Sequence, residues 1–205
     1  LAFRTLQGGR NTGKVVVRVV PSASSASLPL QQNRRPSHPM STAQPRRREH
    51  LVTGGTSGLG LLTARWLAQH GAQMLALASR QGVIARDALA AAEWEAIAAT
   101  HAAVRLEQCD AGAATHVRRL VIGLPMLDGV WHAAGVLGDA LLTKQDASLL
   151  ARVHAPKAHG ASILHAVAAT PLRAFTLFSS ISSLFGGAGQ ANYSAANACL
   201  DALAA

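Results

Sequence analysis

The sequence predicts an α/β protein in which a parallel sheet is covered by helices on both faces. From His50 onward, short apolar segments alternate with helical patterns, and the first apolar segment runs into a glycine-rich turn. Small or polar residues follow the apolar segments, at the positions where strands should end. Alternation at this spacing indicates right-handed βαβ crossovers, and such sheets bind ligands at the carboxyl ends of their strands. We therefore expect a doubly wound sheet of the Rossmann type.

The first strand and its turn occupy residues 51–60, Leu-Val-Thr-Gly-Gly-Thr-Ser-Gly-Leu-Gly, and an amphipathic helix follows until Gly71. This order brings backbone N–H groups and the positive end of a helix to one point, where a pyrophosphate can bind. The glycine spacing departs from GxGxxG, so a plain turn that needs glycine for positive φ is the alternative. The candidate cradle residues are Gly54, Thr56, Ser57, Gly58, Leu59 and Gly60.

The remaining elements follow in regular order along the chain. Apolar or alternating segments predict strands over residues Met74–Ser79, 104–110, 129–134 and 175–179. Helical patterns predict helices between these strands, over residues 85–99, 113–122 and 146–169, the last as one longer helix. A final helix opens at Tyr193.

The residues after the second and third strands bear on the choice of cofactor. Ser79 and Arg80 follow the second strand, where an NAD site usually has an acidic residue and an arginine suits the 2′-phosphate of NADP. A solvated surface arginine is the alternative. Asp110, at the end of the third strand, could accept from an adenine amino group, or it could be a turn residue or helix N-cap.

The fourth strand ends in His132-Ala133-Ala134-Gly135, where the small residues let the backbone approach a ribose or nicotinamide. A histidine at a buried strand end is more often hydrogen-bonded structure than an acid–base group, so we expect His132 to be structural. The other histidines have no metal-ligand spacing, which predicts no metal. Cys109 and Cys199 lie in apolar contexts and are expected to be small core residues.

A candidate proton-transfer group follows the fifth strand. Tyr193 is the only tyrosine, and Asn197 lies one helical turn later on the same face. A phenol can give a proton to a forming alkoxide, and a nearby cation lowers its pKa from about 10. Lys157, on the preceding helix, could supply that charge, and the hydroxyl of Ser180 could polarise a substrate carbonyl. Each residue also has an ordinary structural reading when it is taken alone.

The excess positive charge lies in the N-terminal segment. The net charge is +9, but residues 1–48 contain nine of the 19 basic residues and no acidic ones, so the rest is formally neutral. A basic groove for nucleic acid is therefore not expected, and no apolar run is long enough to span a membrane. Residues 21–49 have the composition of a disordered linker, with an organelle transit peptide as the alternative.

Several motifs together resemble a known family. Residues 53–60, His132–Gly135, Ser180 and the Tyr193-Ser-Ala-Ala-Asn197 run are similar to those of short-chain dehydrogenase/reductases. Most of that superfamily has lysine where this chain has Asn197. Ala155-Pro156-Lys157 instead matches the displaced lysine motif of ketoreductase domains in modular polyketide synthases and animal-type fatty acid synthases. The resemblance covers residues 50–205.

The resemblance implies hydride transfer from NADPH to the β-keto group of an acyl thioester on the phosphopantetheine arm of a carrier protein. Tyr193 would donate the proton, Ser180 would bind the carbonyl oxygen, Lys157 would hold the nicotinamide ribose, and Asn197 would support the proton relay. Leu137-Gly138-Asp139 retains the last residue of the Leu-Asp-Asp signature linked to the R-3-hydroxy product, and Gly138 departs from that signature. Phe185 stands where the opposite class has tryptophan.

The family also implies a larger assembly of neighbouring synthase domains, which we expect to be cytoplasmic, although organelle targeting stays open. Residues 1–20 resemble the end of an enoylreductase domain, which predicts a remnant before the linker. Family members continue beyond Ala205 with a lid and two more strands. We expect the sheet to lack its sixth and seventh strands, and the 205-residue chain to be a poor enzyme alone.

Two other functions fit the sequence less well. The first is a stand-alone reductase, with residues 1–49 as a presequence and Met40 as an alternative start. The second is a non-catalytic nucleotide-binding module, which the presence of Lys157, Ser180, Tyr193 and Asn197 together makes less favourable.

Overall fold

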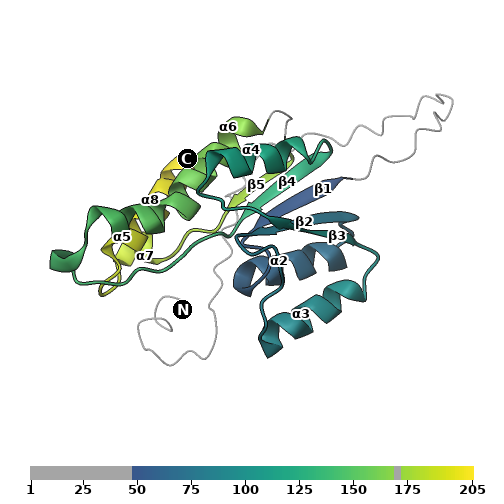
Figure 1. The fold of residues 1–205 in the computed structure, drawn as a ribbon, viewed down its shortest axis with the longest axis horizontal. Helices are drawn as coiled ribbons and strands as arrows, with labels where there is room; N and C mark the ends of the chain where they lie inside the picture. Colours follow the sequence, from purple (N-terminus) through teal and green to yellow (C-terminus); the bar gives the residue numbers. More distant parts are fainter. Residues whose placement is uncertain (1–47, 169–171) are drawn as a thin grey trace, which may run out of the picture. The chain divides into compact units, whose positions relative to one another are not determined.

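A computed structural model describes residues 48–168 and 172–205 of the chain (Figure 1). The expected enoylreductase remnant over residues 1–20 and most of the expected linker over 21–49 lie outside the described residues. The first strand begins at Glu49, one residue before His50, where the sequence predicts that the domain begins.

Five parallel strands form one sheet in the order β3-β2-β1-β4-β5. Their bounds are β1 Glu49–Thr53, β2 Met74–Ser79, β3 Ala103–Gln108, β4 Leu127–His132 and β5 Ala174–Leu177. The chain moves outward from β1 to β3 and then crosses to β4 on the other side of β1. This reversal between β1 and β4 is the topological switch point at which doubly wound sheets bind ligands. The predicted fold class is confirmed.

Helices cover both faces of the sheet (Figure 1). The helices are α2 Gly58–Gln69, α3 Ala88–Ala98, α4 Ala114–Ile122, α5 Ala147–His154, α6 Gly160–Val167, α7 Ser182–Phe185 and α8 Ala191–Ala204. Successive strand residues face opposite sides, so Leu51 packs with α4 and α6 whereas Val52 packs with α2 and α3. These two apolar clusters hold the layers together.

The helix expected over residues 146–169 is interrupted, and that prediction is wrong in detail. A π-helical segment, η2, spans Ala155–His159 between α5 and α6. Pro156 has no N–H group and cannot complete the α-helical ladder, and single π turns are common at functional sites. Two short helices were also not predicted, α7 and the 3₁₀ turn η1 at Leu142–Lys144.

The two cysteines differ. Cys109 is buried and lies in the cluster with Leu51, as expected, but Cys199 is exposed on α8. The prediction for Cys199 is wrong because α8 buries its other face, through Ala196 and Leu200. Within residues 48–168 and 172–205, no helix is long and apolar enough to cross a membrane.

Candidate active site

The turn between β1 and α2 depends on glycine at close contacts. A Cβ atom on Gly60 would lie 2.1 Å from the carbonyl oxygen of Gly54, and one on Gly54 would lie 2.9 Å from the backbone of Ala133. Gly58 has a φ of 48° and opens α2. The Ser57 side chain makes no capping hydrogen bond to that helix. Its first N–H groups therefore receive no side-chain cap from Ser57, which fits the binding of an anion at this end.

A cavity of about 530 Å³ opens at the carboxyl ends of the strands, above this turn. Its volume is in the range of small-molecule and cofactor sites. Most of the predicted cofactor residues line it, namely Gly54, Thr56, Ser57, Ser79, Arg80, Asp110, Ala134 and Gly135. Gly58 and Gly60 do not line it. Gly60 acts on the shape of the turn through its contact with Gly54.

Two of the lining residues also shape their own loops. The Ser79 hydroxyl accepts a 3.0 Å hydrogen bond from the N–H of Gly82. An Asp110 carboxylate oxygen accepts a 2.9 Å hydrogen bond from the N–H of Gly112. Asp110 is therefore a turn residue, and the N-cap alternative is wrong because Ala113 occupies the N-cap of α4.

A second cavity of about 240 Å³ shares Gly135 and Val136 with the first one. Its other lining residues are Leu59, Ala133, Leu137, Lys157, Phe178, Ser179 and Tyr193. The cofactor-sized cavity thus adjoins a smaller one that contains both the predicted proton donor and the predicted cation.

Lys157 projects from the π-helical segment η2 and is only 5% exposed. Its ammonium group donates a 2.8 Å hydrogen bond to the carbonyl of Phe178, and Nζ lies 5.3 Å from the centre of the Tyr193 ring. Burial lowers the pKa of Lys157 to about 8, and Asp201 on α8 opposes this effect. The ammonium group therefore lies within cation–π distance of the Tyr193 ring.

Tyr193 lies in the first turn of α8, with Asn197 one turn later. The Asn197 amide donates a 2.8 Å hydrogen bond to the carbonyl of Tyr193, and its buried Oδ1 has no hydrogen-bond partner among the described residues. The predicted shared face is therefore present. Asn197 contacts the backbone of Tyr193, and its free oxygen leaves a position for a further hydrogen-bond donor.

Ser180 does not line the smaller cavity, whereas its neighbour Ser179 does. The Ser180 hydroxyl accepts a 3.2 Å hydrogen bond from the N–H of Ser182. Ser179 donates a 3.4 Å hydrogen bond to the carbonyl of Asn197. The sequence signal was a pair of adjacent serines, and only the path of the loop after β5 distinguishes them.

His132 is a buried structural residue, as expected. Its Nδ1 lies 2.7 Å from the Thr53 hydroxyl oxygen, and its Nε2 lies 2.9 Å from the carbonyl oxygen of Lys157. Burial lowers the pKa of His132 to about 4. The imidazole is therefore neutral near pH 7 and links β1, β4 and η2.

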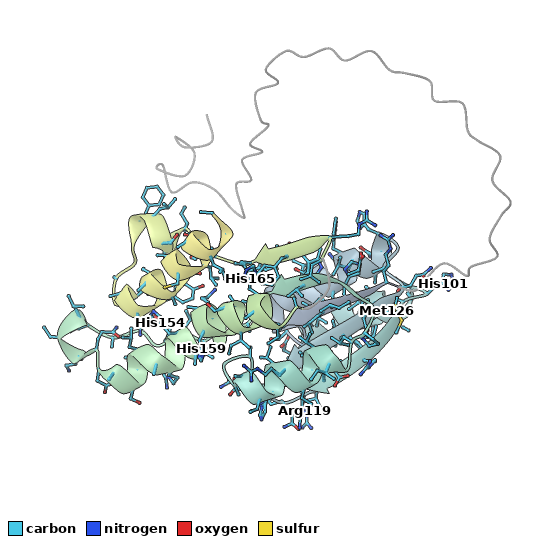
Figure 2. All side chains as sticks on the ribbon, turned by 90° about the horizontal axis from the view of Figure 1, so that it is seen from above. His101, Arg119, Met126, His154, His159 and His165 are labelled. Atoms are coloured by element: carbon cyan, nitrogen blue, oxygen red, sulfur yellow. The ribbon has the colours of Figure 1, made fainter. Side chains whose placement is uncertain are left out.

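In the described part of the chain, no group of histidine, cysteine, aspartate and glutamate residues could hold a metal ion. Figure 2 shows His101, His154 and His165 on separate parts of the molecule. Another cavity, of about 550 Å³, lies at the opposite end of the strands and is lined by residues such as His50, Trp66 and Trp131. None of the predicted site residues lines that cavity.

A parallel sheet with a cavity at its topological switch point is typical of proteins that bind a dinucleotide. The family profile for the KR domain, the ketoreductase domain, matches residues 49–205, and the chain belongs to this family.

The relatives are parts of much longer proteins. The chain is 39% identical over 206 residues to a hybrid PKS-NRPS synthetase, pyvA, of Aspergillus violaceofuscus, covering 98% of this chain and 5% of that protein. It is 46% identical over 158 residues to the polyketide synthase GfsB of Streptomyces halstedii, covering 75% and 3%. The chain thus spans less than a tenth of either relative.

Solved structures agree with the family assignment. An A-type ketoreductase from a modular polyketide synthase matches with a TM-score of 0.70 and 39% identity, over 77% of this chain and 34% of that one. A ketoreductase from the first module of phoslactomycin biosynthesis in Streptomyces sp. HK803 matches with a TM-score of 0.70 and 40% identity, over 77% and 37%.

Proposed function

We propose that this domain reduces the β-keto group of an acyl thioester to a 3-hydroxyacyl thioester, with NADPH as the reductant. The observation that carries the proposal is the position of the Lys157 ammonium, 5.3 Å from the centre of the Tyr193 ring, in the cavity that adjoins the cofactor-sized one. NADPH, when bound, supplies the hydride.

Tyr193 donates its phenolic proton to the alkoxide that forms as the carbonyl carbon is reduced. The ammonium group of Lys157 stabilises the phenolate that remains, because the buried lysine lies beside the half-buried Tyr193 ring and little water screens its charge. Lys157 also holds the ribose of the nicotinamide. Ser180 binds the carbonyl oxygen, an assignment that rests on the resemblance, since its neighbour Ser179 is the serine that lines the small cavity. Asn197 supports the proton relay through its buried Oδ1, which has no hydrogen-bond partner among the described residues.

NADP rather than NAD is the proposed cofactor because Arg80 lines the large cavity directly after β2. An exposed guanidinium at this position can pair with a 2′-phosphate in two-pronged geometry. The pyrophosphate then lies against the turn at residues 54–60, where a Cβ atom on Gly60 would strike Gly54.

The proposed substrate is an acyl chain on a phosphopantetheine-bearing carrier protein, and the proposed partners are neighbouring synthase domains. This part of the proposal is supported by the relatives, which include the polyketide synthases GfsA and GfsB. The R-3-hydroxy product is also proposed. It is supported only by the resemblance of Leu137-Gly138-Asp139 to the signature linked to that product.

The test is an assay of the polypeptide that contains this domain, with NADPH and a 3-oxoacyl N-acetylcysteamine thioester. Oxidation of NADPH should depend on the ketone, and chiral chromatography should identify an R-3-hydroxy product. Tyr193→Phe is the matched variant: it keeps the ring but should lose at least about 100-fold in kcat, the usual contribution of a general acid.

Two results would contradict the proposal. Tyr193→Phe with undiminished turnover would remove the phenol from the mechanism. NADPH binding without any turnover of ketones would support the alternative of a non-catalytic nucleotide-binding module.

A further inference from the structure

Three hydrogen bonds join His132, Lys157 and Phe178 into a closed ring. The His132 Nε2 atom lies 2.9 Å from the carbonyl oxygen of Lys157. The Lys157 ammonium donates to the carbonyl of Phe178 at 2.8 Å, and the N–H of Phe178 donates to the carbonyl of His132 at 3.1 Å. Both ends of Lys157, its backbone and its charge, are therefore held by residues at the ends of two neighbouring strands.

The chemistry of its partners determines which His132 nitrogen carries the proton. A backbone carbonyl can only accept, so Nε2 must donate to Lys157. In a neutral imidazole, Nδ1 is then the acceptor, and the hydroxyl of Thr53 donates to it across 2.7 Å. Thr53 thus selects the tautomer that binds Lys157.

The bond to His132 reaches a part of the helix where the regular ladder is broken. Lys157 lies in the π-helical segment η2, next to Pro156, which has no N–H group. The helix approaches β4 closely here, because a Cβ atom on Gly160 would lie 3.2 Å from Cε1 of His132. A side chain of β4 therefore contacts the backbone from which the lysine projects.

We propose that His132 is a positioning residue for Lys157: its Nε2–H holds the π-helical backbone so that the ammonium group lies between the Phe178 carbonyl and the Tyr193 ring. His132 does not itself reach the reacting atoms. The functional part of this inference rests on the proposed role of Lys157. The positioning part can be measured on the lysine without any turnover.

The proton affinity of Lys157 reports its position. The ionisable groups that act on it in the described structure are Asp201 and Tyr193, both from α8, and His132 from β4 is neutral near pH 7. Burial lowers the pKa of Lys157, so an ammonium that moves toward solvent should regain a higher pKa. Loss of positioning therefore predicts an upward shift.

Two substitutions at His132 test the two hydrogen bonds of its imidazole separately. His132→Asn keeps an amide near the position of Nδ1 and is too short to reach Lys157. His132→Gln can place its amide nitrogen near the position of Nε2 and donate to the Lys157 carbonyl. If His132 positions Lys157, the His132→Gln variant should keep the lysine in place, whereas the His132→Asn variant should not. Thr53→Val is a third variant, which removes the hydroxyl that selects the tautomer.

The measurement is the rate at which acetic anhydride labels Lys157 in the polypeptide that contains this domain, followed by peptide mass spectrometry at different pH values. In the wild-type protein the labelling rate should reach half of its maximum near pH 8, the pKa expected for Lys157. We call this pH the half-point. His132→Asn should raise the half-point by about one unit or more, toward the ordinary lysine value. The half-point of His132→Gln should stay close to that of the wild type. The half-point of Thr53→Val should rise, as it does in His132→Asn.

Turnover provides the second readout. His132→Asn should lower kcat by about tenfold or more with a small change in KM, and the alkaline limb of its pH profile should move with the labelling half-point. Equal half-points for wild type and His132→Asn overturn the inference, as do equal losses in Asn and Gln variants that remain folded by circular dichroism. If His132→Asn does not fold, an unchanged half-point in Thr53→Val overturns it. A shifted half-point in a protein that reduces no ketone sustains the inference and contradicts only the proposed function.

Discussion

Lys157 and Tyr193 come from different helical elements, yet the lysine Nζ lies 5.3 Å from the centre of the tyrosine ring. The lysine is 5% exposed, so little water screens its charge from the ring. This arrangement gives the phenol a cation without a lysine one turn after it, the position that Asn197 occupies.

Binding of NADPH should weaken as the pH rises through about 8. The pKa of Lys157 is lowered to about 8, so its ammonium form is present below that pH and is lost above it. The proposed contact with the ribose is lost in the same range. A fluorescence titration of NADPH binding between pH 6.5 and 9.5 measures the effect. The Lys157→Met variant should bind NADPH weakly at every pH in this range. If its NADPH binding declines equally steeply at alkaline pH, another group causes the decline.

Acid should destabilise the fold through His132. The pKa of His132 is lowered from 6.5 to about 4, so between these values the unfolded chain binds a proton that the folded chain does not. The free energy of unfolding should therefore fall as the pH drops through this window, by up to about 1.4 kcal/mol per pH unit from this one group. Urea denaturation at pH 4.5, 5.5 and 6.5 checks the slope. His132→Gln should have a shallower slope than the wild-type protein, and an equally steep slope in this variant would assign the effect to other groups.

Gly60→Ala should damage the cofactor turn more than Gly58→Ala does. The new Cβ at residue 60 would lie 2.1 Å from the Gly54 carbonyl oxygen, so the turn must move, and such overpacking typically costs about 1–3 kcal/mol. The Cβ at residue 58 meets no atom of residues 48–168 and 172–205 within 4 Å, and its cost is the positive φ, about 1 kcal/mol. Thermal unfolding and NADPH titration measure both variants. Equal losses of NADPH affinity would contradict the proposed importance of the contact between Gly60 and Gly54.

Arg80→Ala should reduce the preference for NADPH over NADH. A hydrogen bond to a charged group contributes about 1.5–3 kcal/mol, which corresponds to about a 10- to 100-fold weaker binding of NADPH. Affinity for NADH should change little, because it has no 2′-phosphate. Arg86→Ala is the matched control, since Arg86 is exposed and does not line the cavity. A uniform loss for both cofactors would indicate that Arg80 shapes the loop instead.

The two thiols should react very differently with iodoacetamide. Cys199 is exposed, whereas Cys109 is buried and its pKa is raised to about 11, mainly by burial. The thiolate is the reactive form, so at pH 8 the native chain should be modified at Cys199 and Cys109 should react only after denaturation. Peptide mass spectrometry distinguishes the sites. Early modification of Cys109 would mean that the cluster around Leu51 opens readily.

The order of strands and helices could be predicted from the sequence because it depends on local patterns. Leu51 and Val52 illustrate this, since adjacent residues of a strand must face opposite layers. The glycine turn and the residues at the strand ends could be predicted in the same way. Parallel strands bring their carboxyl ends to one edge, which predicts that Arg80 and Gly135 line the same cavity, as they do.

Local patterns were therefore enough to predict the fold class, the family and the edge of the sheet where the site lies. Three features became visible only in the folded chain: which of two adjacent serines lines the small cavity, which cysteine is buried, and where the helix over residues 146–169 breaks. The hydrogen bond from His132 to the Lys157 backbone is a fourth. These features depend on contacts between residues far apart in the chain, and local periodicity carries no information about such distances.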